Sequence, residues 1–282
     1  MLSRCTDQRE QRLLRQGRGW FHVAAMGHEA LAAVGLLMRE GDLLAGYYRD
    51  RPIALGRGVQ LEELAHAFHA NALSSSGGRQ MPSHFSDRSL GLFSPSSAIA
   101  SSLLPACGLA WGLQLDGGSE LVVATVGDAG TRQGDFFEAI SLAIEWRLPL
   151  LVLVEDNGLG ISTRTDQSNP LRLGVLNSSL WPSIDAWDGE AVVDAVSAAM
   201  AGIRSGDGPR FLWCRVERLA NHTSNDDHKI YRPAAELERL LERDPLPLFR
   251  ARLERSGELG AGDYERIEAQ WDERVRLAYD LA

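Results

Sequence analysis

The sequence predicts an α/β protein in which a parallel sheet is flanked by helices and followed by a helical C-terminal tail. Three apolar runs of strand length, at 120–128, 148–156 and 209–219, are rich in β-branched residues or leucine. The stretch 134–148 between the first two has a mostly apolar pattern typical of a helix, with Asp135 as its expected N-cap. A strand, a helix and a strand within this length form a βαβ unit, so we expect the two strands to be parallel neighbours.

The segments before the first strand predict helices and one long loop. Charged residues over 7–19 predict a helix that ends near two glycines, and the apolar spacing of 27–40 and 61–73 predicts two more. Residues 74–89 show no period and many turn formers, which indicates a long loop, and such loops often carry function. The run 98–115 predicts an apolar helix whose Pro105 implies a kink or a start later than Ala98.

The end of the chain reads as helical, from 234 to 282. We therefore expect one α/β domain over 1–233 and a helical extension over 234–282 that packs on the same domain. The glycine- and proline-containing stretch 206–209 is expected to be a turn and not a domain boundary.

The composition of the chain disfavours several classes of partner. The chain has 282 residues, a formal net charge of −9 and no long basic run, which disfavours nucleic acid and anionic membranes. Its longest apolar runs are far shorter than a bilayer span, and its charged N-terminus lacks the apolar core of a signal peptide. Cys5, Cys107 and Cys214 are widely spaced and predict reduced thiols, so we expect a cytoplasmic protein.

Two polar side chains stand at the ends of neighbouring predicted strands. Asp128 follows the first strand and Asn157 follows the second, 29 positions later. Ligands of parallel sheets bind beyond the carboxyl ends of the strands, so both side-chain oxygens are expected to face one crevice. A carboxylate, a carboxamide and backbone carbonyls are oxygen ligands that suit Mg²⁺.

The turn after Asp128 adds features of an anion site. Gly127, Ala129 and Gly130 leave the backbone bare, so N–H groups and the start of the next helix can approach a phosphate. The turn matches neither GxGxxG nor GxxxxGK[ST], so nothing indicates a nicotinamide or nucleoside triphosphate site. The alternative without a ligand is that Asp128 and Asn157 are ordinary caps and turn formers.

Several motifs in order carry a resemblance that extends over nearly the whole chain. They are RQGRGWFHVAAMGHEA (15–30), YYRDRP (47–52), GGRQMPSHF (77–85), SSAIA (96–100), the GDA…DN segment and NHTSNDDHKIYR (221–232). The chain resembles the alpha subunit of the thiamine diphosphate-dependent decarboxylating component of 2-oxo acid dehydrogenase complexes. Within that family it most resembles the branched-chain 2-oxo acid members. The resemblance implies the diphosphate-binding domain of the thiamine diphosphate-binding fold.

The resemblance assigns roles around a Mg²⁺–diphosphate centre. Asp128 and Asn157 would bind Mg²⁺ by side chain, and Leu159 by its backbone carbonyl, with Gly127, Ala129 and Gly130 beside the cofactor. Tyr48 and Arg49 match the pair that reaches the diphosphate, for which the planar guanidinium is well suited. The alternative for Arg49 is a surface ion pair with Asp50 or Asp42.

Further matching positions would contact the other end of the cofactor. Ser97 and Ile99 match residues that touch the aminopyrimidine ring, and Ile99 would hold the cofactor in its bent form, although ordinary core is the alternative for it. A loop of small residues matches a monovalent-cation (K⁺) site of branched-chain relatives. Its members are Ser96, Ala98, Ser101 and Ser102.

Two histidines are expected to serve catalysis. His222 lies in a polar loop after a strand, where catalytic residues gather, and in the resembling family this position also contacts the cofactor. It could donate a hydrogen bond to the substrate carboxylate or to an intermediate. Thr223 occupies the position at which animal relatives are phosphorylated. His84, in the RQMPSHF loop, is the second candidate, with a solvated or structural histidine as the alternative.

The implied activity is oxidative decarboxylation of a small 2-oxo acid with transfer of the acyl group to a lipoyl group on a partner acyltransferase. The difficult chemistry would be that of the cofactor. The length of the chain suffices for the diphosphate-binding half, so we expect an α2β2 assembly with a beta subunit carrying the pyrimidine-binding domain.

Departures from the family pattern keep alternatives open. Ala129 replaces the last glycine of GDG, and Arg132 stands where a small residue is common, near enough to favour a diphosphate. Pyruvate or acetoin dehydrogenase alpha subunits share the metal site. A non-catalytic paralogue, or a transketolase-like half-enzyme, would also keep the fold.

Overall fold

A five-stranded parallel sheet forms the centre of the molecule, as the sequence predicts. The computed structural model describes residues 1–282. Every neighbouring pair in the sheet is parallel, and the strand order is β1-β2-β3-β7-β6. The bounds are β1 (Leu43–Ala45), β2 (Val122–Gly127), β3 (Leu150–Asp156), β6 (Ser183–Asp185) and β7 (Arg210–Arg215). The three long strands are those that the apolar runs predict, and the short edge strands β1 and β6 are not foreseen.

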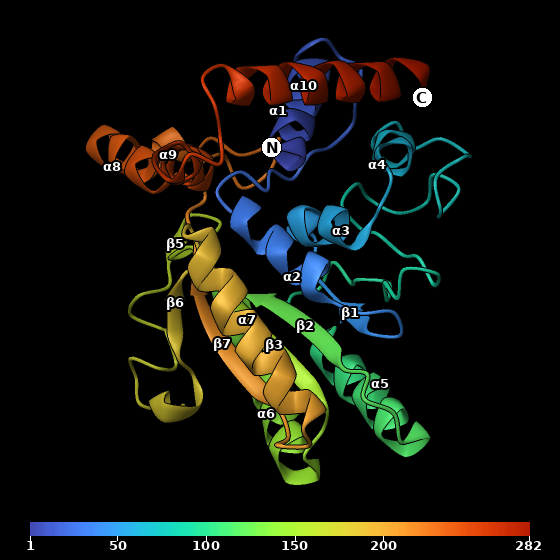
Figure 1. The fold of residues 1–282 in the computed structure, drawn as a ribbon, viewed down its shortest axis with the longest axis vertical. Helices are drawn as coiled ribbons and strands as arrows, with labels where there is room; N and C mark the ends of the chain where they lie inside the picture. The colour runs from blue at the N-terminus through green and yellow to red at the C-terminus, as the bar shows by residue number, and fades with distance from the viewer.

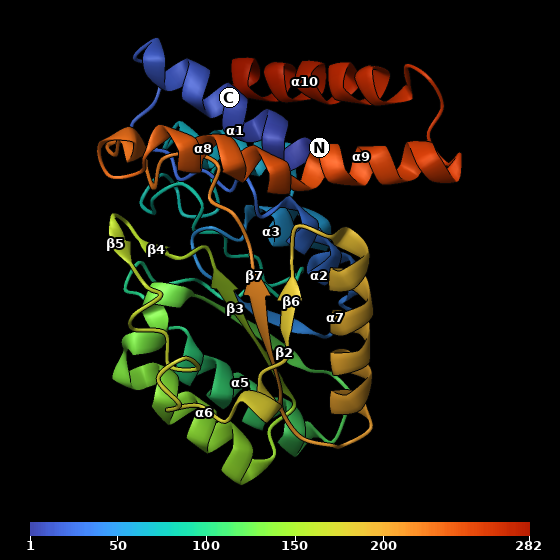
Figure 2. The ribbon, with the colours of Figure 1, turned by 90° about the vertical axis from the view of Figure 1, so that its left-hand side faces the viewer.

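Helices cover both faces of this sheet (Figure 2). Alternate residues of β2 and β3 enter two separate apolar cores: Val122, Ala124 and Val126 pack toward one face, and Leu151 and Leu153 toward the other. The first face is covered by α5 (Leu103–Asp116) and α6 (Gly134–Trp146), and the second by α2 (Ala32–Leu37), α3 (Arg51–Arg57) and α7 (Gly189–Arg204). Strands buried on both faces explain why their sequences are continuously apolar.

The crossover helices differ in how far the sequence predicts them. Helix α6 joins β2 to β3, as expected, but Asp135 as its N-cap is wrong: the cap is Gln133, and Asp135 lies in the first turn without a side-chain capping bond. Its charge still favours the helix N-terminus. Helix α7, which follows Asp188, is not predicted, although Asp188 caps it by accepting from two backbone N–H groups.

The segments before β2 follow the predicted order with shifted ends. Helix α1 spans Leu2–Arg15 and α4 spans Leu61–Phe68. The predicted helix 27–40 is shorter, with a 3-10 turn η1 (Glu29–Leu31) before α2. Helix α5 starts at Leu103, later than Ala98, as Pro105 indicates. Residues 69–102 contain no helix or strand, which confirms the loop.

The C-terminal region is helical, as predicted, and returns to the start of the chain. Helix α10 (Asp263–Leu281) packs against α1 and α4 at the top of the molecule (Figure 1). The division at residue 234 remains a prediction. None of the helices has the length and apolar content that crossing a bilayer requires. The remaining elements are α8 (Ala234–Leu240), α9 (Pro245–Ser256), β4 (Leu159–Gly160), β5 (Thr163–Arg164) and the 3-10 turns η2 (Asp128–Arg132), η3 (Ser178–Leu180), η4 (His228–Ile230) and η5 (Leu241–Arg243).

Candidate functional site

Asp128 and Asn157 meet at the carboxyl ends of β2 and β3. The two strands are in register with Gly127 opposite Glu155. Asp128, which directly follows β2, therefore lies next to the carboxyl end of β3. The Asp128 side chain is only 4% exposed, and its Oδ2 accepts a hydrogen bond from the hydroxyl of Thr165. The backbone of Asn157 also hydrogen-bonds to this carboxylate. The predicted pair is therefore brought together by parallel pairing.

The chain turns sharply after β3 and folds back as the β4–β5 hairpin. Asn157 Oδ1 accepts from the Leu159 backbone N–H at 3.2 Å, and Gly158 between them has a φ of +74°, which suits glycine. Asn157 is thus a turn former as well as a candidate ligand, because its oxygen retains a second lone pair. Leu159 is buried beneath this turn.

The carboxylate of Asp128 has no cationic partner within the chain. Burial, and then the negative charge of Asp156, raise the pKa of Asp128 to about 7. Asp156 itself accepts from Trp213 Nε1 at 2.7 Å, and no Lys, Arg or His forms an ion pair with Asp128. A divalent cation would relieve this charge, so these oxygen donors fit Mg²⁺.

Cationic and polar groups face the same region from the segment 47–49 and from the loop 221–232. Arg49 is 3% exposed, and its guanidinium donates to Ala24 O and, at 3.1 Å, to His222 Nδ1. The ion pair with Asp50 or Asp42 is wrong, because Asp42 pairs with Arg204 and Asp50 accepts from Thr125 and the Tyr47 backbone. Burial, followed by the charges of Arg49 and Arg218, lowers the pKa of His222 to about 4. The Arg49 guanidinium therefore forms no ion pair within the chain, although the Asp226 carboxylate accepts from the backbone N–H of His222, and this free cation suits a diphosphate.

The loop 74–102 supplies the opposite wall. His84 is largely buried, and its Nε2 lies 2.7 Å from Ser97 Oγ. Ile99 is 43% exposed, so ordinary core is excluded for it, and a bulky apolar side chain is presented to ligand. Ser96 Oγ accepts from Ala98 N and Ser101 Oγ donates to Ala98 O, so the K⁺ role of this loop remains a prediction.

One cavity of about 440 Å³ unites all of these positions. Whereas Ser101 of the predicted K⁺ loop does not line it, the residues to which the sequence assigns a thiamine diphosphate, Mg²⁺ or catalytic role do: Tyr48, Arg49, His84, Ser97, Ile99, Gly127, Asp128, Ala129, Gly130, Asn157, Leu159 and His222. The assigned roles themselves remain predictions. The convergence involves segments more than a hundred residues apart, which chance placement would not produce.

The cavity also contains residues that sequence reasoning missed. Phe21, Val23, Met81 and Ile161 contribute an apolar portion, and Tyr47 lies beside the turn at Gly127. Phe21 and Val23 belong to an extended stretch without helix or strand, where apolar side chains next to turn glycines are the only available signal.

The two departures from the family pattern have different outcomes. The Ala129 methyl is directed toward Gly160, where an added Cβ would lie only 2.8 Å from it. Arg132 does not line the main cavity: its side chain is exposed and borders a neighbouring hollow with Ala129 and Thr165, so the expectation that it lies near a diphosphate stays a prediction.

A second buried polar group lies beneath the cavity. Glu155, fully buried in β3, accepts from Tyr47 OH at 3.1 Å and lies 2.5 Å from His28 Nδ1, and Asp50 accepts from Thr125 and from the Tyr47 backbone. Burial raises the pKa of both Asp50 and Glu155, so a proton is retained among these groups. The network fixes the segment that presents Tyr48 and Arg49.

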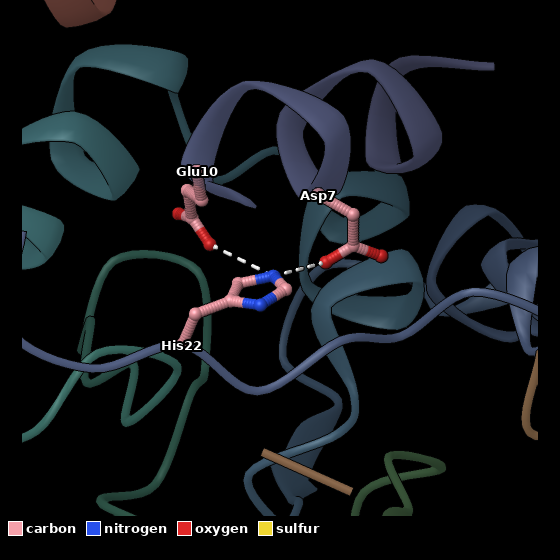
Figure 3. A group of neighbouring side chains, drawn as sticks. All are labelled: Asp7, Glu10 and His22. Carbon is pink, nitrogen blue, oxygen red and sulfur yellow. Dashed lines mark hydrogen bonds and ion pairs between the residues drawn. The ribbon is translucent and has the colours of Figure 1, made fainter. Parts of the chain in front are cut away.

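A third group could be mistaken for a metal site. Ligand atoms of Asp7, Glu10 and His22 lie within 4.8 Å of one another (Figure 3). The guanidinium of Arg51 already pairs with both carboxylates, at 2.6 Å to Glu10 Oε2, and Tyr279 OH donates to Glu10 Oε1 at 2.6 Å. Both carboxylates thus already have partners within the chain, so we interpret the cluster as an ion network that joins α1, α3 and α10.

The geometry defines a class: an α/β protein with a cavity at a strand-end crevice suited to a divalent cation and a phosphorylated ligand. Comparison with known families is more specific. The model of the dehydrogenase E1 component family matches residues 1–282, so the chain belongs to that family. The family resemblance expected from the motifs is thereby confirmed.

Individual relatives agree with this assignment. The chain is 32% identical to the mitochondrial 2-oxoisovalerate dehydrogenase subunit alpha 2 of Arabidopsis thaliana over 249 residues, covering 86% of this chain and 53% of that protein. It is 30% identical to the 2-oxoisovalerate dehydrogenase subunit alpha of Bacillus subtilis over 264 residues, covering 91% and 80%. A pyruvate dehydrogenase E1 component subunit alpha of Staphylococcus aureus is 30% identical over 262 residues, covering 90% and 68%. The chain spans little more than half the length of the plant relatives.

Proposed function

We propose that the chain is the alpha subunit of a 2-oxo acid dehydrogenase and binds thiamine diphosphate with Mg²⁺. The observation that carries this proposal is the convergence of twelve expected residues on one cavity. An uncompensated carboxylate lies at one end, with Arg49 and His222 facing the cavity nearby. A Mg²⁺-bound diphosphate satisfies both the carboxylate and the cationic groups at once.

Each residue would have a distinct task. Asp128, Asn157 and the Leu159 carbonyl would hold the metal, and Thr165 would orient Asp128 as an outer hydrogen-bond partner. Arg49 would hold phosphate oxygens. When bound, the cofactor supplies the carbon nucleophile and the electron sink for loss of CO₂. His222, neutral in the cavity, would donate a hydrogen bond to the substrate.

The substrate would be a small 2-oxo acid with a branched apolar side chain. Support comes from the apolar portion of the cavity, formed by Phe21, Val23, Met81 and Ile161, and from relatives named as 2-oxoisovalerate dehydrogenases. An apolar pocket favours each added methylene by about 1–3 kcal/mol, which would discriminate branched substrates from pyruvate. The acyl group would pass to a lipoyl group on a partner acyltransferase.

A beta subunit is the expected partner, in an α2β2 assembly. Helix α5 is apolar around most of its circumference, yet Trp111 and Leu115 are 45% and 71% exposed. An added Cβ at Gly108 or Gly112 would meet nothing, so another backbone could approach closely there. Helices that are apolar all round are normally buried, which supports coverage by a second chain.

The test is calorimetry of thiamine diphosphate binding with Mg²⁺ on this chain co-expressed with its beta partner, followed by turnover of branched 2-oxo acids and pyruvate. We expect Mg²⁺-dependent binding and a higher kcat/KM for the branched substrates. Binding with preference for pyruvate would support a pyruvate dehydrogenase alpha subunit instead. A well-folded complex that binds no cofactor would overturn the proposal in favour of a non-catalytic paralogue.

A further inference from the structure

Two imidazoles line the cavity, and their hydrogen bonds fix which ring nitrogen carries the proton. We propose that His222 and His84 have opposite tautomers, so that His222 is the donor to substrate and His84 is a positioning residue that makes Ser97 an acceptor. The part concerning substrate rests on the proposed function. The tautomers follow from the chain alone.

His222 must carry its proton on Nε2. The Arg49 guanidinium has only N–H donors, and its Nη2 lies 3.1 Å from His222 Nδ1, so Nδ1 has to present a lone pair. Arg49 is held in this position because its other terminal nitrogen donates to Ala24 O. The positive charges of Arg49 and Arg218 oppose protonation of the ring, and His222 Nε2 makes no hydrogen bond within the chain. An N–H donor therefore remains available to a ligand.

His84 must carry its proton on Nδ1. That nitrogen lies 3.1 Å from the Pro82 carbonyl oxygen, which can only accept. In the neutral ring Nε2 then has the lone pair, and it accepts the hydroxyl proton of Ser97 at 2.7 Å. The arrangement is a carbonyl, an imidazole and a hydroxyl in series, in which His84 is buried and Ser97 is exposed.

The consequence is a division of tasks between two walls of the cavity. Ser97 directs its proton to His84, so its oxygen offers lone pairs to an N–H group of the ligand, such as an aromatic amine. The Nε2 of His84 is occupied by that hydroxyl, so His84 acts through Ser97. His222 offers an N–H to the acceptors of a 2-oxo acid, its carboxylate and keto oxygens. This departs from the sequence-based expectation that both histidines are catalytic.

The first experiment determines the tautomers directly, without any activity. Long-range ¹H–¹⁵N correlation spectra of the ¹⁵N-histidine-labelled full chain near pH 8 distinguish protonated from unprotonated ring nitrogens. The His84→Gln and His222→Gln variants assign the signals by their disappearance. We expect the proton on Nε2 of His222 and on Nδ1 of His84. The same tautomer in both residues, or a doubly protonated His84, would overturn the inference.

The second experiment tests the positioning role in the assembled enzyme. Glutamine at residue 84 places an amide oxygen where Nε2 accepted from Ser97, whereas asparagine can replace only the bond to Pro82. We expect His84→Gln to retain activity within about threefold and His84→Asn to fall about tenfold, equal to Ser97→Ala. The double variant Ser97→Ala/His84→Asn should be no slower than either single variant, with an unchanged pH profile of kcat.

The outcomes separate this inference from the proposed function. Multiplicative losses in the double variant, or loss of one limb of the pH profile with His84→Asn, would show that His84 acts on substrate directly and overturn the positioning role. Confirmed tautomers in an assembly that neither binds thiamine diphosphate nor turns over 2-oxo acids would leave the hydrogen-bond assignment standing and refute the proposed function.

Discussion

The molecule contains two buried groups of charged side chains. Both include carboxylates, but only one of them includes a cationic partner. Around Arg51, the carboxylates of Asp7 and Glu10 have a guanidinium, an imidazole and a phenol as partners, of which Figure 3 shows the imidazole of His22. At the strand ends, Asp128 and Asp156 lie near each other with no cation. Burial pushes the pKa of Asp7 up, but Arg51 and His22 outweigh it and the pKa is lowered.

This difference distinguishes a structural cluster from a binding site. Buried charges are expensive unless they are paired. The Arg51 cluster supplies its own counter-charges and joins three helices, whereas the strand-end group retains an uncompensated negative charge beside a cavity. Unsatisfied charge of this kind is a stability cost that ligand binding can recover.

Removal of the strand-end carboxylate should have the largest effect on cofactor binding. Asp128→Asn should weaken Mg²⁺-dependent thiamine diphosphate binding by at least about 100-fold in the assembled enzyme, because a direct metal ligand is lost. Calorimetry measures this. The control is Asp166→Asn, which removes an exposed carboxylate outside the cavity and should leave affinity unchanged. Equal affinity of wild type and Asp128→Asn would refute the metal role.

The same substitution should change how stability depends on pH. In the folded, metal-free chain the pKa of Asp128 is about 7, which exceeds its unfolded value. The protonated side chain therefore contributes fully to the free energy of unfolding below about pH 4, and this contribution is lost as the pH rises through 7. The loss is on the order of 4 kcal/mol at most. Denaturant unfolding at several pH values should show Asp128→Asn gaining stability relative to wild type across that window. A constant difference would contradict the assignment.

In the paired cluster, removing the cation should be destabilising. Arg51→Met leaves Asp7 and Glu10 buried without their main partner, and we expect a loss of about 3–5 kcal/mol in the free energy of unfolding. Urea denaturation measures it.

The matched control is Arg12→Met on the surface of α1. Arg12 and its partner Asp272 have side chains 47% and 44% exposed, so this change should cost about 0–1 kcal/mol. Equal effects of the two substitutions would mean that burial does not govern the strength of these ion pairs.

Packing at the strand-end turn offers a sharper test of Ala129. Gly160→Ala would bring a methyl within 2.8 Å of the Ala129 methyl and should cost about 1–3 kcal/mol. Ala129→Gly should remove most of that cost in the double variant and, alone, change cofactor affinity little. Unfolding of the four proteins forms a double-mutant cycle. Additive effects would show that the two methyls do not meet.

The smallest expected effect concerns the cationic end of the cavity. Arg49→Lys keeps the charge but loses the planar fork that contacts both Ala24 O and His222, so cofactor affinity should fall about tenfold. Calorimetry on the assembled enzyme measures this, with Arg132→Lys, outside the cavity, as the control. A fall of the same size in the control would indicate a general charge effect.

The sequence by itself determined much of the central sheet and the pair of polar residues at its strand ends. Continuous apolar runs predicted β2, β3 and β7, because strands of a parallel sheet that are buried on both faces need apolar residues at every position. The helical spacing of apolar residues predicted α6. The short spacing from Asp128 to Asn157 determined the strand-end pair, since one βαβ unit necessarily brings its two carboxyl ends together. The three-residue strands were not foreseen because tertiary pairing, and not local pattern, defines them, whereas the local signals of helix α7, its Asp188 cap and its apolar spacing, were overlooked.

Other features were decided only by the tertiary structure. Asp7 and Asp128 are the same residue type, both buried, and nothing in their local sequence says which one has an arginine beside it. Likewise the sequence alone does not distinguish the tautomers of His84 and His222. These depend on contacts with Pro82 O and Arg49 that the tertiary structure provides. The physical reason is that charge pairing and hydrogen bonding act over a few ångströms, between segments that chain order leaves far apart.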